Sequence, residues 1–537
     1  MAMDIKYRVV EKYAVTAELN QPMHIGSAGG DKGEILVHPV DDVPFIQASG
    51  IAGVLRSYCE SYCPQGTAEK FFGKIRKKED DSEKEESEEG GQSDKKESEK
   101  DSDPDDTSEE SFGSRFRISD GYFLNTKDKV GLELRPRIAI NPKTGSVASS
   151  EVKGSGIISG HKFEMEYIGQ GAKCRFLIYD MSPDASVDGD GESEGKKLLE
   201  RLFTAINTED IQFGGQKSNG CGYMKIDTVE FRRFDLTDED QLREWIKDDP
   251  KQMQLWLRGD ESPLPGMQTI EFIAADSTGS GIDHDESARP GVQAIKYNAA
   301  DSIATAYRIT VTGKTENRLL VKAIAVANKD GSAPDARNIT NRAGDYIIPA
   351  SSLKGVLRAR TAKILRLLRK YRKGDIFNIM RDSFGSDIAR DEKTSGNLRF
   401  FDTVVKDVWS GSTNPIAERA SSNHKIHIDK FTGGVMNKAL VTENAVGGEM
   451  TFRINILDMN SPDKTCAVML MALRDLANGQ FNLGSGWASG MGFIDVEKIE
   501  VESSAGKAIL DFKNCTISDE KELIKKCMDT LDKKEAV

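Results

Sequence analysis

A twelve-residue phrase occurs twice in the chain, and this repeat constrains the fold more than any other feature of the sequence. Residues 46–57 read IQASGIAGVLRS and residues 348–359 read IPASSLKGVLRA, with seven of the twelve positions identical at one constant offset. A repeat with so long a period indicates two copies of one domain in this chain of 537 residues. A functional site in one half is therefore expected to have a counterpart in the other half.

Further landmarks occur in the same order in both halves. We expect helices directly after each phrase and again before each glycine-rich turn, at 195–206 and 465–478. The alternation of the first strand in each half is typical of an edge or half-buried strand. The landmarks are alternating strands (8–19 and 307–313), Phe-Gly stops (72–73 and 384–385), strands ending in aspartate (115–120 and 398–402), Thr-Gly segments (137–147 and 425–435) and glycine-rich turns (213–226 and 483–496).

The order strand, helix, strands, helix, glycine loop, strand predicts an α+β fold in each half. Helices on one face of an antiparallel sheet would bury the alternating strands, and a split βαβ (ferredoxin-like) core is the form that we expect. The domain boundaries follow from shifts in composition. We place the first domain at 1–233 with an insert at 74–112, a linker at 234–304 in which 269–275 forms an additional strand, the second domain at 305–515, and a tail with a short polar helix at 516–537.

The charge of the chain does not exclude a nucleic-acid partner. Its formal net charge is −13, but residues 79–110 alone carry 17 acidic and 4 basic side chains, so the remainder sums to zero. This segment has no aromatic or aliphatic residue, and we expect it to be disordered because it cannot bury enough apolar surface to offset chain entropy. We interpret it as a solvated loop rather than a mimic of nucleic acid.

The cysteines and the hydropathy indicate a compartment. Of the seven cysteines, only Cys59 and Cys63 lie close together, on an expected helix. Without a second pair or histidines at ligand spacing, they do not predict a zinc site. The sequence shows no signal peptide, and no apolar run approaches the length needed to span a bilayer. We therefore expect a soluble cytoplasmic protein with reduced thiols and no membrane partner.

The repeated phrase marks a junction between a loop and a helix in each half. Ser49 and Ser351 precede these helices and are the expected N-caps. Free backbone N–H groups and the helix dipole make such a junction a site for anions. Arg56, Lys354 and Arg358 follow one to two turns later, within reach of a phosphate. An ordinary capped helix would explain one copy alone, but the duplication favours phosphate contact.

Basic and glycine-rich segments extend this prediction. Nine basic residues and no acid occupy 354–373, a stripe that is typical of proteins binding a nucleic-acid backbone. In the glycine-rich turns the backbone can approach a ligand closely. Lys217 and Trp487 lie inside these turns and offer a charge and a stacking surface. Neither turn ends in the lysine-serine pair of a nucleotide P-loop, so that site is not expected.

An aspartate-bearing loop precedes each repeated phrase. The first loop, HIGSAGGDKGE (24–34), contains Asp31, and the second, NKDGSAPDAR (328–337), contains Asp330 and Asp335. Such an aspartate could hold a divalent cation or align a ribose-phosphate, although an ordinary turn aspartate is the simpler alternative. The aspartates that end the strands at 115–120 and 398–402 are expected to satisfy backbone groups.

Taken together, these segments resemble the RAMP superfamily of CRISPR effector proteins, and most of all the crRNA-binding backbone subunits of type III complexes. PASSLKGVLR (349–358) resembles the helix-start motif of the family, HIDKFTGG (427–434) resembles the segment leading to its thumb hairpin, and GSGWASGMGF (484–493) resembles its C-terminal glycine-rich loop. The first copy departs from the pattern at Gln47 and Ala52. The resemblance covers about two-thirds of the chain and implies a fused double subunit, similar to those of type III-D.

The resemblance implies two tandem RAMP (RRM-like) domains with thumb hairpins that act in antiviral defence. Their partners would be crRNA, target RNA, a large polymerase-like subunit, other backbone subunits and a small subunit. The family cleaves target RNA at regular intervals with a divalent cation (Mg²⁺ or Mn²⁺), which would make Asp31 the catalytic and metal-binding residue and Asp335 its counterpart. Copy two lacks the His-Ile-Gly lead-in. The implied RNA contacts are His24, Ser49, Gly53, Arg56, Lys217, Ser351, Ser352, Lys354, Arg358, Lys430 and Trp487.

The implied reaction is attack of a ribose 2′-OH on the adjacent phosphate, with the thumb setting the in-line geometry. Three alternatives remain open at this point. The chain could be an RNA-binding scaffold with no active site. It could be a crRNA-processing RAMP endoribonuclease that uses a histidine, for which His24 and His38 are the only candidates near the first loop. It could also be a tandem RNA-recognition protein unrelated to CRISPR, although the aromatic strings of that class are not evident.

Overall fold

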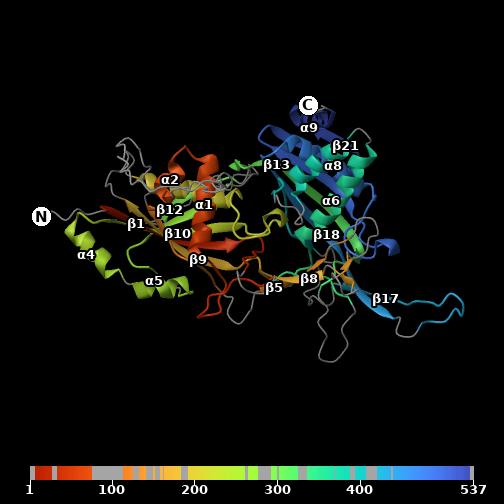
Figure 1. The fold of residues 1–537 in the computed structure, drawn as a ribbon, viewed down its shortest axis with the longest axis horizontal. Helices are drawn as coiled ribbons and strands as arrows, with labels where there is room; N and C mark the ends of the chain where they lie inside the picture. The colour runs from red at the N-terminus through yellow and green to blue at the C-terminus, as the bar shows by residue number, and fades with distance from the viewer. Residues whose placement is uncertain are drawn as a thin grey trace, which may run out of the picture.

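The computed structural model describes most of both halves of the chain. The described residues are 7–26, 33–74, 113–124, 132–138, 140, 149–151, 158–160, 162–182, 192–248, 250–260, 264–275, 292–298, 301–323, 336–368, 371–386, 394–406, 420–436 and 440–532. The acidic insert expected at 74–112 lies outside them except for its first residue. Figure 1 shows the two halves side by side, with the N-terminal half in red to yellow and the C-terminal half in green to blue.

The first half is a sheet whose strands pair antiparallel except for the parallel pair β11–β12, with α1, α2 and α3 on one face. Its strands run in the order β12-β11-β10-β1-β9-β4-β2, and β3 also pairs with β9. The central strands β1 (Val9–Leu19), β9 (Lys173–Ser182) and β10 (Met224–Asp235) are flanked by β2 (Phe45–Ile46), β3 (Phe116–Ile118) and β4 (Gly121–Phe123). The helices are α1 (Ala48–Tyr62), α2 (Thr67–Phe72) and α3 (Glu194–Asn207).

The second half repeats this plan. Its sheet has the order β14-β16-β18-β13-β19-β20-β21, with β15 and β17 also paired to β18. The strands are β13 (Thr305–Leu319), β14 (Ile347–Ile348), β15 (Leu398–Phe400), β16 (Thr403–Lys406), β17 (Ala420–Lys425), β18 (Val441–Leu457), β19 (Asp495–Ser503), β20 (Gly506–Asp511) and β21 (Thr516–Asp519). The helices are α6 (Ala350–Leu367), α7 (Lys373–Phe384), α8 (Pro462–Ala477) and α9 (Leu523–Asp532). The α+β class and the helices expected at 195–206 and 465–478 are confirmed.

Each half has its own apolar core between the sheet and its helices. In the first half, alternate side chains of β1 (Tyr13, Val15, Ala17) pack with Leu55 of α1 and Leu202 of α3. The second half packs β13 and β18 against α6 and α8 in the same way. The first strand of each half was expected at an edge or half-buried, and the edge position is excluded because β1 pairs with both β9 and β10, and β13 with both β18 and β19. We call the sheet face opposite these helices the back face.

The segment 234–304 is not a simple linker. It contains α4 (Glu239–Lys247), α5 (Pro250–Leu257), β11 (Gln268–Ala274) and β12 (Val292–Tyr297), and both strands extend the first sheet. The strand expected at 269–275 is confirmed as β11. The linker prediction underestimated the apolar side chains of α5, since Met253, Trp256 and Leu257 are buried. Figure 1 shows α5 below the first sheet and α1 above it.

The C-terminal tail also belongs to the second half. Strand β21 pairs with β20, and the short turn η7 (Glu520–Glu522) leads into α9. The helix expected there is present, but it is amphipathic rather than polar throughout. Leu523, Cys527 and Leu531 of α9 are buried in the second core.

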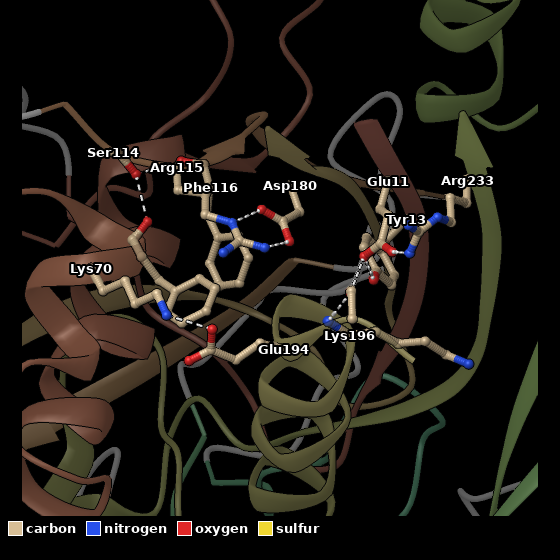
Figure 2. A network of polar contacts seen from close by, with 12 residues as sticks. Glu11, Tyr13, Lys70, Ser114, Arg115, Phe116, Asp180, Glu194, Lys196 and Arg233 are labelled. Carbon is tan, nitrogen blue, oxygen red and sulfur yellow. Dashed lines mark hydrogen bonds and ion pairs between the residues drawn. The ribbon is translucent and has the colours of Figure 1, made fainter. Parts of the chain in front are cut away.

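A buried polar network fixes the start of α3 to the first sheet (Figure 2). Ser193 caps α3 by accepting from the Lys196 N–H, and its hydroxyl donates to Glu11 at 2.6 Å. Glu11 also pairs with Arg233 at 3.0 Å, and the fully buried Asp180 pairs with Arg115. Burial raises the pKa of Asp180, while Arg115 opposes this shift. Because its carboxylates are paired, the network serves the fold.

Two short ribbons complete the first half. Strand β5 (Leu132–Ile138) pairs with β8 (Lys162–Ile168), and β6 (Ser149–Glu151) pairs with β7 (Ile158–Gly160). Figure 1 shows β5 and β8 between the two halves. The Arg135 side chain of β5 reaches Asp402 of the second half.

Candidate nucleic-acid interface

A distant aspartate, rather than the local serine, caps the repeated helix in each half. The N-cap positions of α1 and α6 are Gln47 and Pro349, and neither makes a side-chain capping bond. Asp120 accepts from the Ala48 N–H at 2.7 Å, and Asp402 accepts from the Ala350 N–H at 2.9 Å. The prediction that Ser49 and Ser351 are N-caps is wrong, because both lie inside the first turn. The prediction that the strand-ending aspartates satisfy backbone groups is confirmed.

This capping changes the electrostatics of the helix starts. A carboxylate at the first N–H already interacts favourably with the positive end of the helix dipole, so the helix terminus alone is a weaker anion site than the sequence suggested. In copy one, Ser49 and Gly53 are exposed, and Ser49 lines an open cavity of about 540 Å³ with His38 and Asp120. Arg56 bonds to Glu60 at 2.8 Å and to the Gly73 carbonyl at 2.9 Å.

The two glycine-rich turns have the same backbone conformation. Each contains a short 3-10 helix, η3 (Lys217–Asn219) and η6 (Trp487–Ser489), flanked by residues with positive φ. The hydrogen bond from Phe213 N–H to Gly222 O (2.9 Å) has its counterpart from Leu483 N–H to Gly492 O (2.8 Å). Each turn also donates a bond to the strand leading to the aspartate loop, at His24 O and Leu320 O, 2.8 Å in both cases.

The turn of copy one packs against copy two. Lys354 of α6 donates to the Ser218 hydroxyl at 2.7 Å, and Arg399 of β15 donates to Gln212 at 3.0 Å. The rings of Tyr223 and Phe401 stack with centroids 5.3 Å apart. Gly220 is so close that an added Cβ would lie 1.9 Å from the Phe400 carbonyl oxygen. We call this contact between the two halves the internal joint.

Ion pairs border the internal joint. Arg135 of β5 is buried between Glu133 and Asp402, and it contacts Asp402 at 2.5 Å. Glu133 also accepts from the Arg342 N–H at 2.8 Å. Asp402 thus holds both the start of α6 and the joint, which links the repeated helix to the other half of the chain.

A cluster of cations lies at the internal joint. Lys354, Arg137 and Arg399 bond only to neutral acceptors among the described residues, and none of the three forms an ion pair there. Burial, together with Arg358, Arg399 and Arg137, lowers the pKa of Lys354 to about 8. Partial desolvation and Arg399 also lower the pKa of Lys217, which is exposed as a residue.

Such a cluster is suited to an anion. Like charges that repel one another without a compensating carboxylate raise the free energy of the unliganded site. A phosphate would reverse this repulsion and accept charge-assisted hydrogen bonds from Lys354 and Arg137, which are half-buried, while the buried Arg399 adds only its charge. Ser351 and Ser352 lie half-buried in the first turn of the same helix as Lys354. The arrangement can therefore bind a polyanion along the line where the two halves meet.

A hairpin with exposed apolar side chains extends from the second half. It follows β17, which Figure 1 shows projecting away from the body of the protein. Asp429 closes the turn by accepting from the Phe431 and Thr432 N–H groups at 2.9 and 2.7 Å, and these bonds lower its pKa. The Phe431 side chain is 97% exposed, and Lys430 beside it is also exposed.

The remaining expected residues have different surroundings. His24 is only 8% exposed, and its Nδ1 lies 2.9 Å from the Glu166 carbonyl oxygen, so it packs inside the fold. Trp487 is 66% exposed on η6. Asp31 and Asp335 lie outside the described residues, as does Asp330. In the part of the chain that the structure describes, no group of three or more histidine, cysteine or acidic side chains could hold a metal ion.

The structure adds Arg137, Ser218 and Arg399 to the site, which the sequence analysis missed. The sequence does contain one indication of Arg399, because an arginine lies three residues before the capping aspartate in both halves, Arg117 in copy one and Arg399 in copy two. No sequence pattern pointed to Arg137 or Ser218, since their role depends on how the two halves dock.

Comparison with known proteins identifies the two halves. The model of the RAMP superfamily matches residues 16–225 and 279–495, which together are most of the chain. A search of curated proteins found no match. Among the described residues, no helix has the length and apolar character needed to cross a membrane.

Proposed function

Because the chain belongs to the RAMP superfamily, whose members are CRISPR-associated proteins that bind crRNA, we propose that it is a fused double backbone subunit of a type III effector complex, similar to those of type III-D. The observation that carries this proposal is the cation cluster at the internal joint, where Lys354, Arg137 and Arg399 have only neutral partners. The crRNA backbone would supply the missing negative charge. Other backbone subunits, a large polymerase-like subunit and a small subunit would be the protein partners.

The arrangement of strands supports the expected core. In the first half, β10, β1 and β9 lie side by side, and β3 and β4 pair with the far edge of β9. In the second half, β19, β13 and β18 lie in the same order, and β15 and β16 pair with β18. We interpret this order as the ferredoxin-like core of a RAMP domain. The hairpin that carries Phe431 would be the thumb of copy two, because an exposed ring on a projecting hairpin can insert between stacked bases.

Target cleavage is the second part of the proposal. Asp31 would act beside the base that a thumb displaces, with Asp335 in the same role in copy two. The first loop begins at His24 and the second follows Leu320 in the chain, and each of these two residues accepts a hydrogen bond from a glycine-rich turn. Both loops would therefore face the same RNA strand. Lysine and arginine of the cluster would bind the phosphates and stabilise the charge that develops when the 2′-OH attacks.

A divalent cation would be the cofactor of this cleavage. A bound Mg²⁺ or Mn²⁺ would supply Lewis-acid stabilisation of a phosphate oxygen. The described residues contain no cluster of three or more possible ligands, and Asp31, which lies outside them, is the candidate that would hold the cation.

The test is the change Asp31→Ala in an assembled complex, with Asp335→Ala as the matched variant of copy two. We expect Asp31→Ala to abolish one cut in the target RNA and to leave crRNA binding unchanged, because the cation cluster is intact. If the complex still gives every cleavage product, the catalytic assignment is wrong. If neither variant changes cleavage, the chain is a structural scaffold for crRNA.

The geometry argues against a crRNA-processing endoribonuclease that uses a histidine from the first loop. His24, the histidine of that loop, is buried and engaged with Glu166. His38 lies outside the loop, where it packs against Phe45 and Tyr122 and lines the open cavity beside Ser49. A general acid or base must reach the reacting proton. Binding of RNA to a basic joint is therefore the better supported role.

A further inference from the structure

The back faces of the two sheets are covered in different ways. In copy two, Arg453 and Asn455 of β18 point to the back face, and Glu209 of copy one contacts both, at 2.7 and 3.5 Å. The glycine-rich turn of copy one follows Glu209 directly and completes the internal joint. The back face of copy two is therefore covered by the other half of the chain.

Copy one covers the corresponding face with its own helices. Leu177 and Tyr179 of β9 occupy the positions of Arg453 and Asn455, because Ile178 and Ile454 pair with Tyr13 and Ile309 at matching places on the first strand of each half. Leu177 packs with Trp256 and Leu257 of α5.

Polar contacts fix this cover in place. Lys12 of β1 is buried and pairs with Asp248, which follows α4, at 2.6 Å. Arg175 of β9 donates to the Trp256 carbonyl at 2.9 Å, and Tyr179 packs edge-on against Trp245. Helices α4 and α5 thus cover the back face of copy one, and copy one covers the corresponding back face of copy two.

The glycine-rich turn of copy two, which corresponds to the turn of copy one in the internal joint, is not covered in this way by any of the described residues. The turn of copy two has the backbone bonds of the turn of copy one, yet Trp487 and Phe493 are 66% and 48% exposed. Gly490, the counterpart of Gly220, has open space around it, because an added Cβ would lie 4.0 Å from its nearest neighbour, the Arg318 side chain. Beside this turn, the Lys425 ammonium lies 3.5 Å from the Ser489 hydroxyl.

The exposed glycine-rich turn of copy two can be compared with the surface of copy one that corresponds to the joint surface of copy two. In the internal joint Ser218 meets Lys354, and the equivalent positions of the second pairing are Ala488 and Ala52. Glu209 meets Arg453, and the equivalent positions are Gly479 and Leu177. Both members of each polar pair are replaced together by small or apolar residues, which would preserve complementarity in a more apolar contact.

We propose that α4 and α5 form a cap that ends head-to-tail association at copy one, so that the chain has one open docking face, the glycine-rich turn of copy two. Without the cap, the back face of copy one would accept the turn of a second copy of this chain. A head-to-tail contact that does not close produces open filaments, and terminal units of repeat arrays prevent this with a cover. This inference depends on the proposed function at one point only, which is the identity of the natural partner that binds the open turn.

The experiment compares oligomeric state without RNA, by light scattering after size exclusion at several concentrations. The cap is removed by replacing residues 236–264 with a short Gly-Ser turn, which is feasible because β10 and β11 are antiparallel neighbours. A second variant, Trp256→Glu with Leu257→Glu, keeps the chain and charges the buried side of α5. Each is tested alone, with Ala488→Arg on the open turn, and with Ala505→Arg, the same change on the exposed β19–β20 turn.

We expect the full chain to be monomeric and each uncapped variant to form oligomers that grow with concentration. Ala488→Arg should return the uncapped variants to monomers, and Ala505→Arg should not. The proposal is overturned if folded uncapped chains stay monomeric, if their association is indifferent to Ala488→Arg, or if the full chain itself associates through Ala488. RNA affinity, measured separately, decides the proposed function, so the two failures are distinguishable.

Discussion

The pH dependence of RNA binding tests the role of Lys354 directly. Burial and three nearby arginines lower the pKa of this lysine to about 8 in the free protein. A bound phosphate would return the pKa toward the ordinary value of about 10.4. Below pH 8 the free lysine is already charged, so binding takes up little proton. Above pH 8 it is neutral, and binding must take up one proton, so affinity falls as the pH rises toward the pKa of the bound state.

The size of the effect follows from these two values. Between pH 7 and pH 9 the affinity for RNA should fall about tenfold, or about 1.4 kcal/mol. The assay is fluorescence anisotropy with labelled oligoadenylate, whose bases do not titrate in this range, at constant ionic strength because salt alone changes affinity. Lys354→Arg is the matched control, since arginine stays charged throughout, and its affinity should be flat with pH.

Two results would refute this reasoning. One is an equal loss of affinity for the natural chain and for Lys354→Arg, which would assign the titration to another group. The other is an affinity that rises with pH, because the sign of the linkage would then be opposite to that of a lysine recharged by phosphate.

Two further pairs of variants test the fold that supports the site. Asp402→Ala removes a helix cap and leaves Arg135 with one buried partner, so we expect a loss of about 3–5 kcal/mol in the free energy of unfolding. Asp120→Ala removes only a cap and should cost about 1 kcal/mol. Equal losses for the two variants in urea titrations would contradict this. Gly220→Ala brings a Cβ to 1.9 Å from the Phe400 carbonyl, so thermal unfolding should show a loss about 1–3 kcal/mol larger than for Gly490→Ala, which shares the positive φ but has open space; similar losses would mean that the joint is not tightly packed.

The repeat made much of the fold predictable. Local patterns identify α1, α6 and the two glycine-rich turns, because periodicity and glycine act over a few residues. The helix caps were assigned wrongly, to Ser49 and Ser351, since Asp120 and Asp402 lie 72 and 52 residues from the N–H groups from which they accept. Serine in the first turn was the locally reasonable choice, and tertiary structure overrode it.

The cation cluster was only partly predictable for the same reason. Lys354 and Lys217 were identified from motifs, but the sequence could not show that they meet at one joint. That contact depends on docking one half onto the other, which requires Gly220 to approach Phe400 and Tyr223 to stack on Phe401. The segment 234–304 was misassigned because its prolines and glycines suggested a linker, whereas Trp256 and Leu257 are buried against the sheet.

The most direct test of the central claim is to map where RNA contacts the chain. Photocrosslinking of bound RNA followed by mass spectrometry should give crosslinked peptides from the turn at 212–223 and from the start of α6, because these segments form the internal joint with Lys354. Crosslinks confined to other surfaces, with none in these two segments, would contradict the assignment of the cation cluster as the RNA site.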